Sequence, residues 1–201
     1  AVVGKKTLDL SGVDANWTDL EGYRHDVEKL GPAVNAMMLV GHNTIRSLEM
    51  GNERRAPRDG ELERMREHIG LAMEQGACGF STGLIYRPGR WSDTEEVLEL
   101  AKAVAPFDGI YATHMRNEND HLLEAVDEAL DIGSKAGVAV QISHHKAAGK
   151  RNWGKVKESL AKVDAAVAEG ARVTLDVYPY TAGSGPMIQY FDIKNPNPEL
   201  A

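Results

Sequence analysis

The feature that most constrains the fold is a recurrence of short, nearly continuous runs of apolar and small residues. Runs in which hydrophobic residues do not alternate with polar ones are typical of strands covered on both faces, as in a parallel sheet. Four of the runs are rich in β-branched residues, and a fifth is weaker. The expected strands are residues 35–41, 77–82 (the weaker run), 109–113, 138–143 and 172–178.

Helical patterns lie between these runs. Hydrophobic residues recur at three- and four-residue spacing in segments 59–74, 92–104, 119–136 and 153–169. Ser92 followed by Glu95 is a capping-box pattern that predicts the start of the second helix, and Gly137 is expected to cap the end of the third. Alternating strands and helices, in units of roughly thirty to forty residues, predict parallel strands joined by right-handed crossovers.

About five such units fit into the 201 residues, which places the chain in the α/β class. A closed eight-unit barrel typically needs ~250 residues. The pattern therefore indicates the central portion of a (β/α)8 barrel, with residues 1–201 as one partial barrel domain. A five-stranded open sheet is the competing fold, and the pattern alone leaves that alternative open.

Composition narrows the classes of partner. A formal net charge of -7 argues against a nucleic-acid surface and against a polybasic membrane anchor. The longest apolar stretch, residues 36–40, is too short to cross a bilayer, and residues 1–6 do not have the pattern of a signal peptide. The single cysteine, Cys78, fits a reducing compartment, so we expect a cytoplasmic protein.

Two histidines follow successive expected strands at equivalent positions. His114 comes directly after the run 109–113, and His144 directly after 138–143. Residues at the C-terminal ends of parallel strands converge on one mouth, and neutral imidazole is a natural zinc ligand. The spacing suggests a two-histidine metal centre but leaves a structural, hydrogen-bonded role open. His145 is expected to point to the opposite face and to pack there.

The strings around these positions, taken together and in order, resemble the D-aminoacylase family, the N-acyl-D-amino-acid deacylases of the amidohydrolase superfamily. The resemblance covers roughly residues 23–187 and implies a distorted (β/α)8 barrel with a zinc site at its mouth. The strings that carry it are residues 40–46, 76–86, 113–118, 142–146 and 176–180.

The resemblance also implies roles for individual residues. His114 and His144 match zinc-ligating histidines, and Lys146 matches a residue that binds the carboxylate of a small N-acyl amino acid substrate. Tyr86 matches a tyrosine that contacts substrate near the scissile amide. Two further positions on the substrate side of a later loop are Tyr178 and Ser184. From residue type alone, Lys146 could instead be a surface lysine, and Tyr86 could simply pack.

The implied reaction is hydrolysis of N-acyl-D-amino acids, by a zinc-activated water, to a carboxylate and a D-amino acid. The chain lacks the family's His-x-His pair and its Gly-Asn-Cys-Gly string, and the general-base aspartate is expected outside the chain. We therefore expect a segment of a longer enzyme. Cys78 is expected to be a small buried residue rather than a ligand, and His42 to be structural.

Two further expectations concern residues near the histidines. Arg116 and Glu118 are expected to form an ion pair beside His114, and Asp176 is expected to be buried with a hydrogen-bond partner. Two alternative functions stay open: a cyclic-amidase type of amidohydrolase, and a non-catalytic fragment or ligand-binding α/β module that lacks the full metal site. The sequence predicts no oligomeric state.

Overall fold

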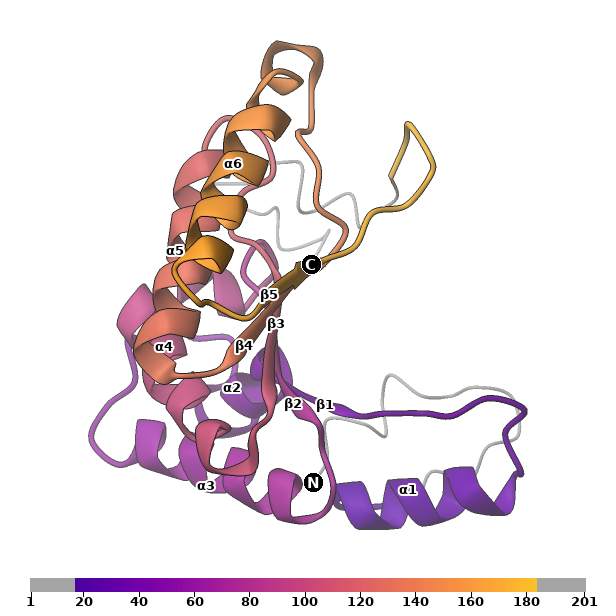
Figure 1. Ribbon diagram of the computed structural model, residues 1–201. Helices are drawn as coiled ribbons and strands as arrows, with labels where there is room; N and C mark the ends of the chain where they lie inside the picture. The colour runs from indigo at the N-terminus through magenta and orange to yellow at the C-terminus, as the bar shows by residue number, and fades with distance from the viewer. Residues whose placement is uncertain (1–16, 184–201) are drawn as a thin grey trace, which may run out of the picture.

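The computed structural model describes residues 17–183, and its centre is a five-stranded parallel sheet (Figure 1). The strands pair in chain order, each parallel to the next. They are β1 (Leu39–Gly41), β2 (Gly79–Gly83), β3 (Ile110–His114), β4 (Ala139–Ile142) and β5 (Val173–Leu175).

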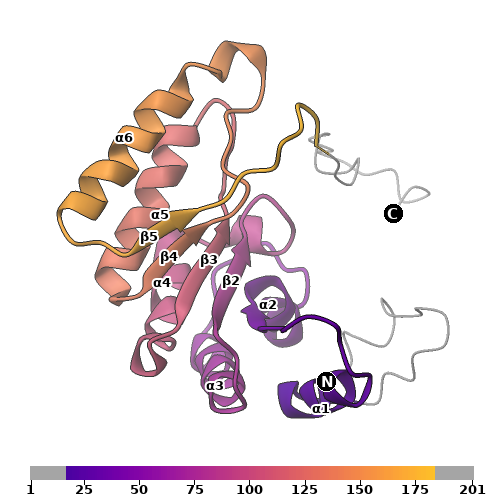
Figure 2. The same ribbon diagram turned by 45° about the vertical axis from the view of Figure 1, so that its right-hand side comes forward.

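Helices connect the strands. The α-helices are α1 (Leu20–Lys29), α2 (His42–Met50), α3 (Glu61–Glu74), α4 (Thr94–Lys102), α5 (Leu122–Ala136) and α6 (Lys155–Ala168). Three short 3-10 helices are η1 (Gly89–Trp91), η2 (Ala105–Phe107) and η3 (Lys150–Asn152). Figures 1 and 2 show α3, α4, α5 and α6 along one side of the sheet. No helix within residues 17–183 is long and apolar enough to cross a membrane.

The strand order decides between the two folds that the pattern left open. Right-handed crossovers between strands taken in sequence place the helices on one face, as in a (β/α) barrel. A doubly wound open sheet instead reverses its strand order at a switch point and carries helices on both faces. The order β1-β2-β3-β4-β5 contains no reversal. The predicted α/β class is confirmed, and the arrangement is consistent with a segment of a (β/α) barrel.

The core lies between the sheet and the helices. Phe80, Tyr111 and Val140 stand side by side in register across β2, β3 and β4, and all three side chains are buried. Because side chains alternate along a strand, Ala112 and His114 lie on the face of β3 opposite to Tyr111. The sheet therefore directs His114 away from the helix-covered core, toward what would be the inside of a barrel.

Several element boundaries differ from the predictions. The first and last strands are shorter than expected, at Leu39–Gly41 and Val173–Leu175. The N-cap of α4 is Asp93, whose side chain accepts a hydrogen bond from Glu96 N at 2.8 Å, so the predicted Ser92 cap is wrong. Ser92 Oγ instead donates to Gly89 O at 2.6 Å. Helix α2 was not predicted, because it begins directly after β1 without a side-chain cap.

Candidate metal centre

The carboxyl ends of β3 and β4 bring the two predicted histidines together. His114 is the last residue of β3, and His144 lies two residues after β4. Their ring centroids are 4.4 Å apart, and the ring planes are inclined by 72°. This is the proximity that the equivalent strand-end positions predicted.

Glu118 completes the cluster. Ligand atoms of His114, Glu118 and His144 all lie within 4.8 Å of one another, a grouping that could hold a metal ion. The Glu118 side chain is only 10% exposed, and its Oε2 lies 2.6 Å from Nζ of Lys146. The other carboxylate oxygen lies 2.8 Å from Nδ1 of His144. The loop after β3 therefore supplies a carboxylate to the site.

The predicted ion pair between Arg116 and Glu118 is wrong. Arg116 instead donates from Nε and Nη2 to the carboxylate of Glu128 on α5, with distances of 2.9 to 3.2 Å. A guanidinium fork matches a carboxylate with two parallel donors, and Glu128 accepts both. Glu118 is left free to pair with the ammonium of Lys146. Its position four residues after His114 was the signal in the sequence that could have marked it as part of the site.

The donor set fits a divalent cation. Within the described part of the chain, Nε2 of His114 is buried and has no hydrogen-bond partner. Burial lowers the pKa of His114 to about 4, although the nearby Glu118 carboxylate acts in the opposite direction. The imidazole is therefore neutral at neutral pH, which is the form that binds a metal. Two neighbouring imidazoles are donors typical of zinc sites.

The backbone at His144 is held in an uncommon conformation. His144 has a φ of 40°, in the left-handed region that residues with a side chain seldom adopt. Its backbone N–H donates to Oδ1 of Asp176 at 2.7 Å, and the N–H of His145 donates to the backbone oxygen of Asp176, also at 2.7 Å. Asp176, just beyond β5, thus fixes the turn that presents His144. The expected hydrogen-bond partner of Asp176 is present, but its expected burial is wrong, since the residue is exposed.

His145 behaves as predicted. Its Nε2 lies 2.9 Å from Oγ of Ser159 on α6, and the residue is 5% exposed. Burial lowers its pKa, so the ring is neutral in the interior. The adjacent histidines His144 and His145 therefore face different surroundings, one the mouth of the sheet and the other the helix layer.

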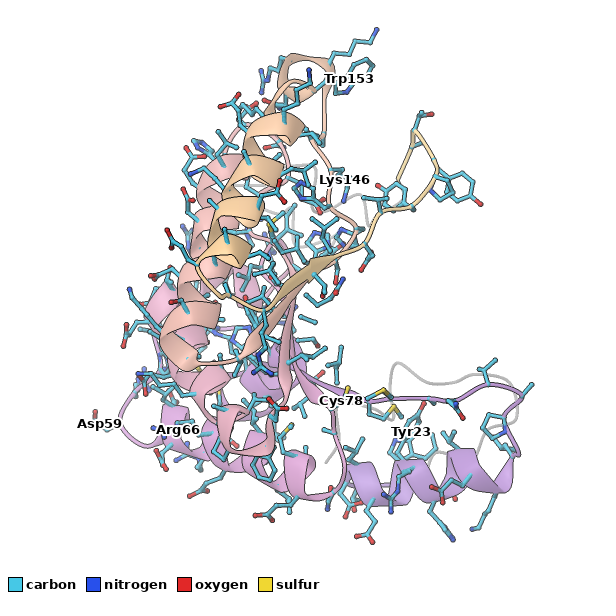
Figure 3. All side chains as sticks on the ribbon, in the orientation of Figure 1. Tyr23, Asp59, Arg66, Cys78, Lys146 and Trp153 are labelled. Atoms are coloured by element: carbon cyan, nitrogen blue, oxygen red, sulfur yellow. The ribbon has the colours of Figure 1, made fainter. Side chains whose placement is uncertain are left out.

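The residues predicted on the substrate side are placed as follows. Tyr86, after β2, has its ring centroid 4.9 Å from that of His114. Lys146 lies in the loop after β4 (Figure 3), with Nζ 5.4 Å from the ring centroid of Tyr178. Tyr86, Lys146 and Tyr178 thus come to the same mouth from the loops after β2, β4 and β5. Ser184 lies outside the described residues.

His42 and Cys78, which were expected to be structural rather than ligands, do not belong to the cluster. His42 is fully buried at the start of α2, with Nε2 2.8 Å from Oε1 of Glu96. Cys78 precedes β2 and donates from Sγ to Met38 O at 3.1 Å. It is half-buried rather than buried as expected. Neither belongs to a group of metal-capable side chains within residues 17–183.

Comparison with known proteins gives close matches among curated sequences, whereas no family model matches the chain. A D-aminoacylase from Alcaligenes xylosoxydans xylosoxydans is 45% identical over 152 residues, which are 76% of this chain and 31% of the relative. An N-acyl-D-glutamate deacylase from the same organism is 38% identical over 177 residues, 88% of this chain and 36% of the relative. The chain spans about one third of the length of the curated relatives that it matches.

Solved structures share the fold at similar identity. A crystal structure of D-aminoacylase, described as defining a novel subset of amidohydrolases, has a TM-score of 0.79 and 41% identity, over 83% of this chain and 35% of that one. N-acyl-D-glutamate deacylase from Bordetella bronchiseptica, solved with zinc and a phosphonate inhibitor, has a TM-score of 0.78 and 38% identity, over 82% of this chain and 35% of that one. The chain therefore belongs to the family of D-aminoacylases and N-acyl-D-amino-acid deacylases.

Proposed function

We propose that this chain is part of a longer zinc-dependent enzyme that hydrolyses N-acyl-D-amino acids to a carboxylate and a D-amino acid. The observation that carries the proposal is the pair of imidazoles at the ends of β3 and β4, with ring centroids 4.4 Å apart and a lysine beside them. The relatives support it, since they are a D-aminoacylase and deacylases of N-acyl-D-glutamate and N-acyl-D-aspartate.

His114 and His144 would hold the zinc ion. A bound zinc supplies a water of lowered pKa and polarises a carbonyl group. The histidines suit this role because one ring is neutral through burial and the other is presented by a fixed turn. The general base is expected in another part of the enzyme.

Lys146 would bind the free carboxylate of the substrate. The α-carboxylate of an N-acyl amino acid carries a negative charge, and an ammonium on a flexible stem is a suitable partner for it. Lys146 Nζ lies 3.0 Å from Nδ1 of His144, so a carboxylate bound there would place the neighbouring amide near the metal site. Tyr178, whose ring lies beside the ammonium, would border the same pocket.

Tyr86 would act on the amide carbonyl. Its ring lies against that of His114, on the unit before the metal site. A hydroxyl donor near a developing oxyanion stabilises the tetrahedral intermediate. The phosphonate bound in the related Bordetella bronchiseptica deacylase mimics such an intermediate, which supports a hydrolytic mechanism of this kind.

The cyclic-amidase alternative is less well supported. Enzymes of that type bridge two metals with a carbamylated lysine at a strand end before the histidines. The sequence has no lysine between Lys29 and Lys102, so neither β1 nor β2 ends at one.

A cytoplasmic location stays a prediction that rests on the single cysteine.

The deciding assay measures release of D-amino acid by the complete protein. N-acetyl-D-methionine and N-acetyl-D-glutamate are the test substrates, and N-acetyl-L-methionine is the matched control. We expect turnover of at least one D-substrate and none of the L-enantiomer. A protein that hydrolyses neither D-substrate would contradict the proposed function and favour the non-catalytic alternative. Equal hydrolysis of both enantiomers of N-acetylmethionine would contradict the proposed specificity for D-amino acids.

A further inference from the structure

Among the described residues, the Glu118 carboxylate contacts both halves of the proposed site, the metal-binding His144 and the substrate-binding Lys146. Its Oε2 lies 2.6 Å from the ammonium of Lys146, and its Oε1 lies 2.8 Å from Nδ1 of His144. The carboxylate is well shielded from water, with 10% of its side chain exposed. Its backbone oxygen also accepts from Ala148 N at 2.7 Å, which ties the loop after β3 to the loop after β4.

Lys146 poses an electrostatic problem for a cation site. Its ammonium lies 3.0 Å from Nδ1 of His144, and like charges repel strongly where water is excluded. This neighbouring ammonium would weaken the binding of a divalent cation to His144 unless a negatively charged group lay close to both. Among the described residues, the carboxylate within ion-pair distance of both groups is that of Glu118.

The imidazole of His144 has two candidate partners at Nδ1. Lys146 can only donate a hydrogen bond, and Glu118 can only accept one. A histidine that binds a cation through one ring nitrogen carries its proton on the other and usually donates it to a carboxylate or carbonyl. Oε1 of Glu118 is buried and makes no hydrogen bond of acceptable geometry with residues 17–183, although Nδ1 lies close to it. Donation from Nδ1 would satisfy this oxygen and leave Nε2 for the cation.

We propose that Glu118 is a positioning residue that joins the two halves of the site: one oxygen orients the His144 imidazole for the cation, and the other holds and neutralises the Lys146 ammonium beside it. The proposal rests on the proposed function for the role of Lys146, but its effect on cation binding does not require deacylase activity. Glu118 acts here through its neighbours rather than as a ligand, because Oε2 is already paired with the ammonium.

The test is the affinity of the complete protein for zinc alone, measured by competition with a chromophoric chelator. Glu118→Gln should weaken zinc binding by about 10- to 100-fold, the usual effect of removing a carboxylate behind a ligating histidine. Glu128→Gln is the matched control: that side chain is 12% exposed and paired with Arg116, but does not touch the cluster. It should bind zinc as the wild type does.

A double-mutant cycle separates a charge effect from general damage. Lys146→Met alone should not weaken zinc binding, and Glu118→Gln combined with Lys146→Met should bind zinc more tightly than Glu118→Gln, because the uncompensated ammonium is gone. If Glu118→Gln fails to fold, Glu118→Asp keeps the charge with a shorter reach and should show an intermediate loss.

Three results would overturn the proposal: wild-type zinc affinity in Glu118→Gln or in the substitute Glu118→Asp, an equal loss in Glu128→Gln, or no recovery in the double variant. These outcomes are independent of the deacylase assay. The expected zinc affinities without release of D-amino acid would refute the proposed function alone, whereas deacylase activity with unchanged zinc affinity in Glu118→Gln would refute this inference alone.

Discussion

Of the clusters within residues 17–183 that contain a histidine, a glutamate and a cation, two differ most clearly in their surroundings. In the first, between α2 and α4, the side chains of His42, Glu96 and Arg46 are 0%, 2% and 0% exposed. In the second, at the ends of β3 and β4, those of His144, Glu118 and Lys146 are 28%, 10% and 29% exposed. Residue type alone therefore does not distinguish a structural cluster from a candidate site.

The difference lies in what else each group contacts. Arg46 pairs with Glu96 and also donates to the backbone oxygens of Glu53 and Arg55, at 3.2 and 2.6 Å, so its donors are used within the fold. Lys146 lies at a partly open mouth, beside His144 and the ring of Tyr178, and His144 in turn packs against a second histidine, His114. A closed network stabilises the fold, whereas a network with partly exposed groups and a second imidazole can exchange a partner for a ligand.

The largest effect is expected from a substitution that disrupts the closed cluster, the buried group of His42, Glu96 and Arg46. Arg46→Met would leave the buried Glu96 carboxylate without its guanidinium, which typically costs about 3–5 kcal/mol of stability. We expect a markedly lower melting temperature of the complete protein with unchanged zinc content per folded molecule. Arg24→Met, which removes an exposed partner of Glu28, is the control, and a change of about 0–1 kcal/mol is expected there. Loss of zinc at an unchanged melting temperature would reverse the assignment of the two clusters.

The next largest effect is expected beside the open cluster, the partly exposed group of His144, Glu118 and Lys146. Tyr86→Phe should lower kcat by about 10²-fold, as removal of one oxyanion donor usually does, with zinc content and KM little changed. Tyr23→Phe on α1, whose ring lies 5.0 Å from that of Trp17, is the control and should leave kcat unaltered. A Tyr86→Phe enzyme with wild-type kcat would show that the ring only packs against His114.

A smaller effect is expected from Lys146→Met. Loss of an ion-paired hydrogen bond to the substrate carboxylate costs about 1.5–3 kcal/mol, so KM should rise roughly 10- to 100-fold while zinc remains bound. Lys162→Met on α6, an exposed lysine paired with Asp127, serves as the control. If kcat falls and KM does not, Lys146 acts on the reaction centre rather than on the substrate carboxylate.

The smallest effect belongs to an ion pair next to the closed cluster. Hydrogen bonds from Arg55 and from the backbone of Arg58 lower the pKa of Glu61 from 4.5 to about 2. Because the folded pKa is depressed, this carboxylate contributes stability above pH 4.5 and loses it as the pH falls toward 2. We expect the melting temperature of Glu61→Gln to lie below that of the wild type at pH 7 and to converge with it toward pH 2. A constant gap over this range would contradict the pairing.

The sequence predicted the fold better than the site. Continuous apolar runs separated by helical patterns indicated the parallel units, because burial on both faces leaves a strong trace in composition. Helix α2 was missed, since it follows β1 at Gly41 without a side-chain cap. The pair of histidines was found because strand ends of successive units converge, a consequence of topology.

The remaining parts of the site depend on loop geometry, which composition does not reveal. Arg116 and Glu118 are two residues apart and of opposite charge, so pairing was the simple expectation, yet Arg116 reaches Glu128 on α5 instead. The role of Asp176 in holding His144 arises from the left-handed turn at His144, which becomes visible only with backbone angles. Ser184, matched by resemblance, remains a prediction.

The central claim is that His114 and His144 bind the metal, and zinc content tests it most directly. The complete protein with both residues changed to alanine should lose the stoichiometric zinc that the wild type retains after dialysis. The variant with His68 and His121 changed to alanine is the control, because both side chains lie apart from the cluster, 38% and 71% exposed. It should keep its zinc. Stoichiometric zinc in the His114→Ala, His144→Ala protein would contradict the account.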